Sequence, residues 1–317
     1  MKIKDIYEKA YKWGMEIDPR GADEVRLALE KAKKSFDGLK DNEKERFDME
    51  RLRNPYADTR ILYGDPDRDV KTVMVGIDIE VGEVLLADRL GERSKEIDLI
   101  IAHHPEGRAM ANLYAVMDMQ AGILKKYGVP INVAEDIMDE RIKEVERRIM
   151  PVNHMRAVDA ARLLDIPFMC IHTPADNSVV GFLQKLFDEK KPSYVSDIID
   201  TLEEIPEYKN AMMEVLAPKV VSGAPDRRAG RVFVDMTGGT GGSKKAFESL
   251  STAGVGTVVG MHISEDHRKE AAKHHVNVVI AGHVSSDSIG VNLLLDQVLS
   301  PDVEVVEAAG FRRVVRT

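Results

Sequence analysis

The stretch IDLIIAHHPEGR, residues 97–108, is an apolar run that ends abruptly in two adjacent histidines and a proline. Asp98–His104 is typical of a buried strand, in which successive side chains point to opposite faces. His103 and His104 would therefore face opposite ways unless the chain turns, and Pro105 favours a turn. The stretch predicts a strand whose tip delivers two imidazoles to one place.

Other short apolar runs resemble this one and alternate with helical patterns such as 243–254 and 288–299. This alternation predicts a layered α/β protein, in which ligands gather at the carboxyl ends of strands. The predicted strands are Val70–Asp78, Asp98–His104, Pro167–Thr173, Lys219–Gly223, Arg231–Met236, Thr257–Met261, Val276–Gly282 and Val303–Ala308.

Residues 1–60 are charged and helical in pattern, which predicts an N-terminal helical extension. Helices are predicted over 5–14, 18–36 and 41–52, with Asp18 placed to start the second one. Their charge suggests a role in packing or in an interface.

The remaining chain predicts one α/β domain, residues 61–317, made of two halves. The first half covers 61–192 and is mostly helical over 109–164. Helices over 193–215 connect it to the second half, 216–317. One internal sequence similarity favours two related halves. The segments DLIIAHHP at 98–105 and NVVIAGHV at 277–284 are both β-branched runs that lead to histidine.

Composition excludes several classes of function. The chain has 317 residues, is 44% apolar and carries a net charge of −9 with both signs interspersed, so a nucleic-acid partner is not predicted. No run approaches the ~18 apolar residues of a membrane span, and no secretion signal is indicated. Cys170 is the only cysteine, which excludes an internal disulfide and favours a cytoplasmic location.

Acidic residues follow two strand-end histidines at the same spacing. His172 is followed four positions later by Asp176, and His283 by Asp287. Each aspartate precedes a helical pattern, so an N-cap is the simpler interpretation of either one taken alone. His172 alone is more easily explained as a core histidine than as a ligand.

Together, these histidines and aspartates form a set that metal chemistry requires. Neutral imidazoles and carboxylates that converge from separate elements bind divalent ions. Four or five such ligands are too many for one catalytic ion and suit two ions bridged by a carboxylate and a hydroxide. The set fits Zn, Mn, Fe, Co or Ni without choosing among them.

The order of these motifs resembles the Nif-three-like family, also called GTP cyclohydrolase I type 2-like. The resemblance is carried by VKTVMVGID (70–78), DLIIAHHP (98–105), IHTPAD (171–176), the glycine-rich turn after RVFVDM (231–236) and AGHVSSDSIGVNLLL (281–295). It implies a three-layer α/β/α fold with mixed sheets and two similar halves. It also implies a ring-shaped homo-oligomer, commonly a hexamer, and two divalent ions per chain on His103, His104, Asp176, His283 and Asp287.

This sequence departs from the family pattern in several places. The last ligand is usually glutamate, whereas Asp287 has a shorter reach. Glu106, Gly107 and Arg108 follow the His-His-Pro motif, where the family prefers an apolar residue. The segment between His104 and Asp176 and the amino-terminal helices are longer than the resemblance implies.

The turn DMTGGTGGSKK, residues 235–245, fits neither glycine-rich nucleotide fingerprint. It is interpreted either as a tight strand-to-helix turn or as a substrate-binding backbone nest at Gly239 and Gly241, with Lys244 or Lys245 nearby.

The predicted function is a metal-dependent hydrolase acting on a small molecule, one that could contain a nucleotide or phosphate. A metal-bridging hydroxide would be the nucleophile. Glu106 or Glu265 is the candidate proton shuttle, and Arg108 would bind an anionic group of the substrate. Two alternatives remain open: ring opening of a purine nucleotide, and a non-catalytic metal-binding scaffold.

Overall fold

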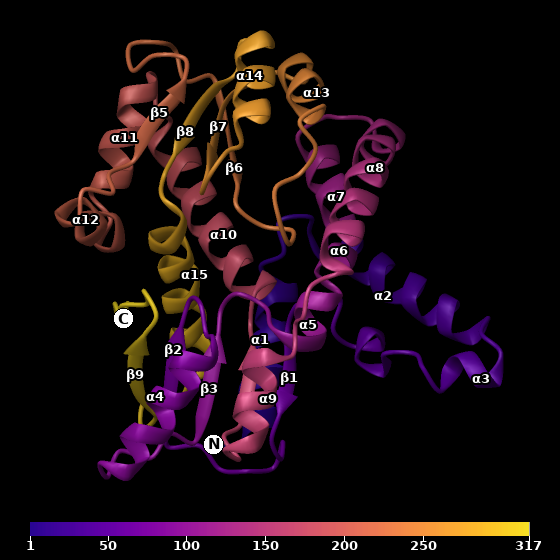
Figure 1. The fold of residues 1–317 in the computed structure, drawn as a ribbon. Coiled ribbons are helices and arrows are strands. Elements are labelled where there is room, and N and C mark those ends of the chain that lie inside the picture. The colour runs from indigo at the N-terminus through magenta and orange to yellow at the C-terminus, as the bar shows by residue number, and fades with distance from the viewer. Residues whose placement is uncertain (317) are drawn as a thin grey trace.

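The computed structural model describes residues 1–316, which form two lobes, each built on one sheet. Figure 1 shows the first sheet in the lower lobe and the second in the upper lobe, with long helices running from one to the other. The predicted α/β fold with mixed sheets is confirmed.

The first sheet has the strand order β1-β4-β3-β2-β9. β1 is antiparallel to β4, whereas the other neighbours are parallel. Apolar residues fill the central strands because both faces of the sheet are covered. β1 was not among the predicted strands, and β9 comes from the predicted second half. The strands are β1 (Arg60–Tyr63), β2 (Thr72–Gly76), β3 (Leu99–Ala102), β4 (Phe168–Cys170) and β9 (Glu304–Ala308).

The second sheet repeats this plan with the order β5-β8-β7-β6. β5 is antiparallel to β8, and the remaining pairs are parallel. β8 therefore corresponds to β4, and β7 to β3. The similar segments 98–105 and 277–284 contain β3 and β8, which do not occupy equivalent positions in the two sheets. The strands are β5 (Lys219–Ser222), β6 (Arg231–Asp235), β7 (Val255–Gly260) and β8 (Asn277–Ile280).

The predicted helical segments are confirmed over 109–164 and 193–215. The helices are α1 (Ile3–Glu16), α2 (Ala22–Asp37), α3 (Asp41–Lys44), α4 (Val81–Glu92), α5 (Gly107–Ala111), α6 (Leu113–Val116), α7 (Asp118–Lys126), α8 (Ile131–Ile149), α9 (Arg156–Leu163), α10 (Thr173–Lys190), α11 (Val195–Glu203), α12 (Pro206–Met213), α13 (Ala246–Thr252), α14 (Glu265–Lys273) and α15 (His283–Val298).

Each sheet has helices on both faces. Apolar residues of α4 and α9 pack on one face of the first sheet, and those of α1 and α15 on the other. In the second sheet, α10 and α11 cover one face, and α7, α8, α13 and α14 cover the other. α10 follows β4 and α15 follows β8, and these two helices pack along each other between the lobes.

The amino-terminal helices differ from the prediction. Helix α1 packs into the core of the first lobe, whereas α2 protrudes from it (Figure 1). α2 begins at Ala22 and not at Asp18, because the Asp18 carboxylate instead binds the Arg20 guanidinium at 2.8 Å. The helix predicted over 41–52 breaks into α3 and a short 3-10 helix, Met49–Leu52, since the Asp48 side chain accepts a bond from the Glu50 amide and starts a new turn.

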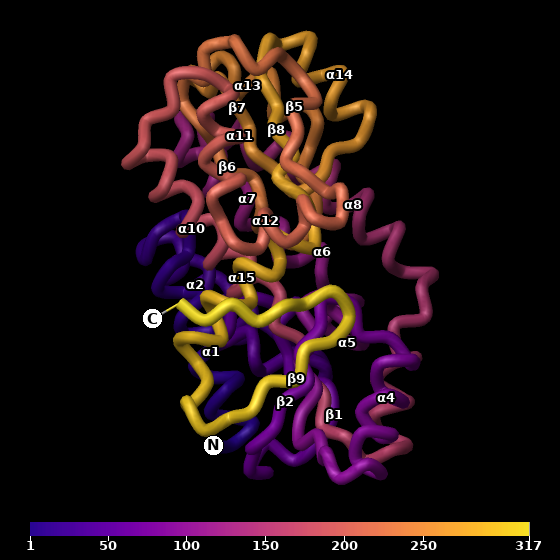
Figure 2. Tube along the Cα trace, turned by 90° about the vertical axis from the view of Figure 1, so that its left-hand side faces the viewer, coloured from indigo at the N-terminus to yellow at the C-terminus, as the bar shows by residue number. Residues whose placement is uncertain are grey.

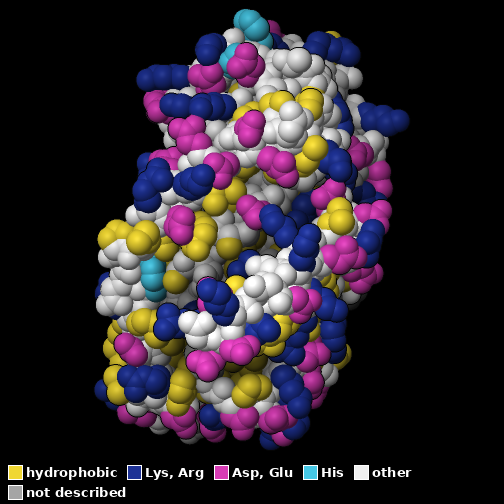
Figure 3. Space-filling model, turned by 90° about the vertical axis from the view of Figure 1, so that its right-hand side faces the viewer, with side chains coloured by type: hydrophobic (Ala, Val, Ile, Leu, Met, Phe, Trp, Pro, Cys, Tyr) yellow, Lys and Arg dark blue, Asp and Glu magenta, His cyan; other side chains and the backbone are white. Residues whose placement is uncertain are grey.

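The carboxyl-terminal segment crosses the side of the molecule beside α15, as Figure 2 shows. Arg316 anchors it by donating to Glu207 on α12 at 2.6 Å. Figure 3 shows another face of the molecule, on which acidic and basic side chains are interspersed. Within residues 1–316, every helix is too short or too polar to cross a membrane.

Candidate metal centre

The His103–His104 pair lies where the carboxyl ends of the strands meet. β3 ends at Ala102, but both histidine amides still donate to the β2 side, His103 to Gly76 and His104 to Ile77. Because both residues lie beyond the strand, their rings need not point to opposite faces, and the ring centroids are 5.2 Å apart. His103 is buried, and His104 is partly exposed at 27%. The prediction that the strand tip brings two imidazoles together is confirmed.

Asp287 lies between the two lobes, and its two carboxylate oxygens face three histidines. Its Oδ1 is 3.5 Å from His103 Nε2, and its Oδ2 is 3.5 Å from His104 Nε2. The same Oδ2 is 3.6 Å from His283 Nε2. The shorter aspartate side chain therefore reaches all three imidazoles.

Asp176 completes the buried side of the cluster. Its Oδ1 is 3.4 Å from His103 Nε2, and its Oδ2 is 3.7 Å from His172 Nε2. Helix α10 begins at Thr173 and α15 at His283, so Asp176 and Asp287 lie inside the helices. The N-cap interpretation of these aspartates is therefore wrong.

The residues of the cluster could hold a metal ion. Among the described residues, His103 Nε2 and both Asp287 oxygens are buried without a hydrogen-bond partner, an arrangement that is costly unless another ligand satisfies them. Ligand atoms converge to within 4.8 Å of one another in three overlapping groups: His103, Asp176 and Asp287; His104, His283 and Asp287; His103, His104 and His172. All five predicted ligands belong to these groups, and His172 joins them.

The outward nitrogens of three histidines are held by oxygen acceptors. His104 Nδ1 donates to Asp78 at 2.6 Å, and His172 Nδ1 donates to the fully buried Asp58 at 2.8 Å. His103 Nδ1 faces the carbonyl oxygen of Ile171 at 3.3 Å. Such bonds fix the ring orientation and leave each Nε2 free for a metal ion. Asp58 and Asp78 were missed from the sequence, although Asp78 ends a predicted strand.

The charges of the buried carboxylates favour a positive charge within the cluster, either a proton on a histidine or a bound cation. Burial lowers the pKa of His103, but the carboxylates of Asp287 and Asp176 outweigh it and raise this pKa to about 10. The neighbouring histidines hold the pKa of Asp287 far below its usual range despite burial. Burial lowers the pKa of His283 and of His262, which favours neutral imidazoles at both positions.

A cleft of about 360 Å³ opens onto the cluster. Three of the predicted site residues, Glu106, Gly239 and Gly241, line it. Burial raises the pKa of Glu106 to about 7. His262 also lines the cleft, with its ring centroid 5.0 Å from that of His283. It follows β7, in the position that His103 and His104 occupy after β3.

Two predicted site residues lie outside the lining of this cleft. Glu265 is on the exposed side of α14, where it accepts from Arg268 at 2.7 Å. Arg108 donates to Glu50 at 3.0 Å and to the carbonyl oxygen of Ile61 at 2.8 Å. Sequence position alone does not reveal which side of a short helix faces a cleft, and both predictions were based on position.

The glycine-rich turn is a strand-to-helix connection. Gly238 and Gly239 have φ angles of 93° and 87°, which favour glycine. Lys244 pairs with Asp266 and Lys245 with Glu140, so both ammonium groups are already bound to carboxylates. The following helix, α13, has only seven residues. These contacts favour the tight-turn interpretation over a lysine-assisted anion nest.

Comparison with solved structures finds a crystal structure of a NIF3 superfamily protein from Sphaerobacter thermophilus. It is 31% identical, covers 80% of this chain and 92% of its own, and superposes with a TM-score of 0.71. Reduced HcgD from Methanocaldococcus jannaschii is 16% identical over 83% of this chain and 93% of its own, with a TM-score of 0.49. A Bacillus cereus protein related to NIF3 is 13% identical over 79% and 89%, with a TM-score of 0.42. No family model and no curated protein matches the chain.

Proposed function

This chain belongs to the NIF3 superfamily, and on this premise we propose that it is a metal-dependent hydrolase that binds two divalent ions. The observation that supports two ions is the position of Asp287, whose two oxygens face different histidines. A carboxylate in this position can bridge two ligand groups. His103, His172 and Asp176 would complete one group, and His104 and His283 the other.

The ions would supply Lewis acidity and lower the pKa of bound water. The chain itself supplies orientation: Asp58 and Asp78 hold the rings of His172 and His104 in place. Glu106 lines the same cleft two positions after His104, which places a carboxyl group where it can take or give a proton. His283 is 43% exposed, so the side of the cluster that it forms is open to a substrate.

Metal content tests the proposal directly. We expect about two divalent ions per chain after purification without chelators and incubation with Zn, Mn, Fe, Co or Ni. His104→Asn and His283→Asn should each lose at least one ion, whereas His275→Asn, a matched change on the exposed surface, should lose none. Wild-type protein with less than about one ion per chain would contradict the proposed site.

Catalysis needs its own test. Metal-loaded protein should hydrolyse at least one of a panel of amides, esters, phosphomonoesters and phosphodiesters, and His283→Asn or a chelator should abolish that turnover. Metal-loaded protein that turns over none of them would reduce the proposal to a metal-binding protein, the scaffold alternative.

We also propose a ring-shaped homo-oligomer, with a hexamer as the expected state, and a cytoplasmic location. The family resemblance supports the ring, and the single buried Cys170 supports a reducing compartment. Light scattering on the metal-loaded protein tests the assembly, since a monomer at micromolar concentration would contradict it.

A further inference from the structure

One buried side chain holds two peptide groups of the glycine-rich turn, residues 235–245. The Gln120 amide nitrogen, on α7, donates to the carbonyl oxygens of Gly238 and Thr240, each at 2.7 Å. Gln120 is only 7% exposed, and it is not among the residues that line the metal cleft. Both carbonyl groups therefore point towards α7 and out of the cleft.

The N–H groups of Gly239 and Gly241 point the other way. In a trans peptide the N–H group is directed opposite to the carbonyl group of the preceding residue, and residues 1–316 contain no cis peptide bond. Neither of these two N–H groups donates a hydrogen bond within residues 1–316. Both glycines line the metal cleft. Gln120 therefore presents two free backbone donors to the cleft.

Gly241 lies beside the proposed metal centre. A Cβ at Gly241 would have one neighbour within 4 Å, the Cε1 atom of His262 at 3.9 Å. The His262 ring lies 5.0 Å from that of His283, between centroids, and His283 Nε2 is 3.6 Å from Asp287. The space next to Gly241 is thus open, and a group that occupied it would lie close to the histidines of the cluster.

The next two carbonyl groups of the turn are also held. Arg141 Nε donates to the Gly241 carbonyl oxygen at 3.0 Å, and His267 Nε2 lies 2.9 Å from the carbonyl oxygen of Gly242. A side chain at Gly242 would collide with the Gln120 amide oxygen. Donors that are fixed in this way need no reorganisation when a ligand arrives.

The ligand that suits these donors is an anion. Paired backbone N–H groups bind negatively charged oxygen atoms. Helices α10 and α15, of 18 and 16 residues, begin at the same cleft, where the positive ends of their dipoles favour negative charge. The proposed ions would favour it too. Glu106 and Asp235 oppose an anion, but burial raises their pKa values to about 7 and about 6, which reduces their charge near neutral pH.

We infer that the N–H groups of Gly239 and Gly241 bind a negatively charged oxygen of the substrate, and that Gln120 is the positioning residue that orients them. The inference rests on the proposed hydrolase function and adds a substrate-binding site to it. Phosphate and carboxylate groups both present such an oxygen, so inorganic phosphate and acetate are the two probes.

Two variants remove the site in different ways. Gly241→Ala places a methyl group in the open space beside His262, and alanine is tolerated because the φ angle of Gly241 lies outside the left-handed region. Gln120→Met keeps a long side chain but removes both donors, which frees the two peptide groups. Calorimetric titration of metal-loaded protein should give a Kd for the bound anion at least about tenfold higher in each variant than in wild type.

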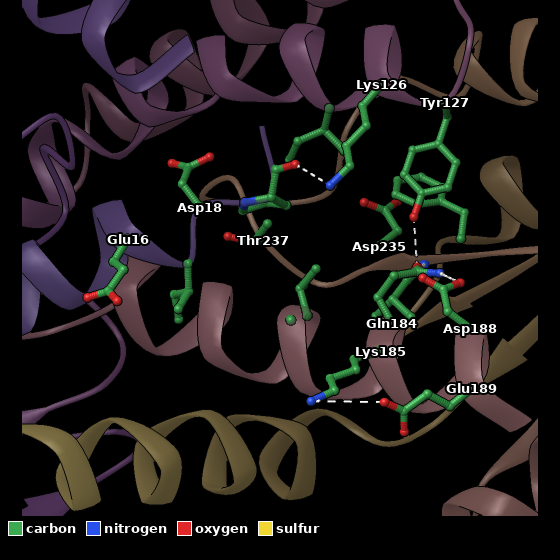
Figure 4. Close-up of a pocket in the computed structure, with 17 residues that line it drawn as sticks. Glu16, Asp18, Lys126, Tyr127, Gln184, Lys185, Asp188, Glu189, Asp235 and Thr237 are labelled. Atoms are coloured by element: carbon green, nitrogen blue, oxygen red, sulfur yellow. Dashed lines mark hydrogen bonds and ion pairs between the residues drawn. The ribbon is translucent and has the colours of Figure 1, made fainter. Parts of the chain in front are cut away.

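Each variant has a matched control. Gly82→Ala changes a glycine on α4 that also has open space around it. Gln184→Met removes a glutamine that lines a second pocket, of about 440 Å³, where Figure 4 shows its bond with Tyr127. Gln184 also donates to the Val232 carbonyl oxygen at 3.2 Å, so its loss perturbs the second lobe without touching the turn. Both controls should keep the wild-type Kd when all proteins are compared at equal metal content.

Hydrogen exchange observes the N–H groups themselves. The amides of Gly239 and Gly241 should exchange rapidly in wild type because they have no acceptor. Saturation with phosphate or acetate should slow exchange in the peptide that covers residues 236–243, as measured by mass spectrometry. The same anion concentration should not slow it in Gln120→Met. A purely structural role of Gln120 would change the exchange rate without making it respond to the anion.

The two anions identify the substrate group. A loss of affinity for phosphate alone assigns the site to a phosphate group, and a loss for acetate alone assigns it to a carboxylate. Unchanged Kd values for both anions in both variants overturn the N–H pair, while the metal-dependent hydrolase stands. Failure of wild type to bind either anion does the same. Wild-type protein that carries no metal would instead contradict the proposed function, and metal content is measured before any anion is added.

Discussion

Gly290 of α15 lies directly against the backbone of Ala175 in α10, with no room for a side chain between them. Ala175 precedes Asp176, and Gly290 is three positions after Asp287. The contact between the two helices therefore sets the separation of the two carboxylates that we propose as ligands, one on α10 and one on α15.

Substitution of Gly290 should disturb both packing and metal binding. A Cβ at Gly290 would meet the carbonyl group of Ala175, which cannot move without moving α10. We expect Gly290→Ala to lower the free energy of unfolding by about 1–3 kcal/mol and to reduce metal content. Gly181→Ala is the matched control, since Gly181 has open space around it on α10. It should be neutral or stabilise by about 0.5–1 kcal/mol. Urea unfolding measures both, and equal stability of Gly290→Ala and wild type would refute the close crossing.

Removal of the Asp78 carboxylate should weaken metal binding without unfolding the protein. Asp78 holds His104 at 2.6 Å but is itself 65% exposed. We expect Asp78→Ala to weaken the binding of one ion by about 10–100-fold. The free energy of unfolding without metal should change by less than about 0.5 kcal/mol. Competition with a chromophoric chelator gives the affinity, and Asp136→Ala serves as the control. Unchanged affinity would mean that the His104 ring is held by other contacts.

Metal binding should release protons near neutral pH. In the metal-free protein, Asp287 and Asp176 raise the pKa of His103 to about 10, so this ring is protonated below that pH. An ion can bind only the neutral ring, and the apparent affinity should therefore rise with pH up to about 10. Calorimetry in buffers of different ionisation enthalpy counts the protons, and we expect about one per chain from His103. Binding without proton release would contradict a His103 ligand.

Chelation should destabilise the protein. Without an ion, the buried atoms of His103 and Asp287 have no hydrogen-bond partner among the described residues. A metal at a hundred times its Kd adds about 2.7 kcal/mol to the free energy of unfolding. We therefore expect a chelator to lower the Tm of wild type, measured by calorimetry, by several degrees. His283→Asn, loaded with less metal, should show a smaller decrease. An equal decrease in both would place the stabilising ion elsewhere.

The predicted ligand residues lie close together in the structure because they follow strands. His103, His104 and His283 come directly after apolar runs, and the carboxyl ends of parallel strands share one edge of a sheet. The spacing from histidine to aspartate occurs in both halves and indicated Asp176 and Asp287. The same repetition includes His172, which the structure places beside His103 and His104.

Other features had no local signal. Asp58 lies in a loop before β1, and its contact with His172 joins residues far apart in the chain. No periodicity reveals such a contact. The orientation of Glu265 and Arg108 depended on how short helices pack, which is decided by tertiary contacts. The end of α2 was predicted to within one residue, but its start was not. The Asp18 carboxylate accepts hydrogen bonds from Arg20 and Tyr56 instead of capping the helix.

The position of β9 has a consequence for synthesis on the ribosome. β9 pairs with β2 along the open edge of the first sheet, although the entire second sheet lies between them in the chain. The first lobe therefore emerges from the ribosome with the edge of β2 unpaired. This edge stays unpaired until β9, near the end of the chain, has been synthesised. Exposed edges of this kind favour pairing between nascent chains. Brief chaperone protection of β2 during translation would prevent that pairing.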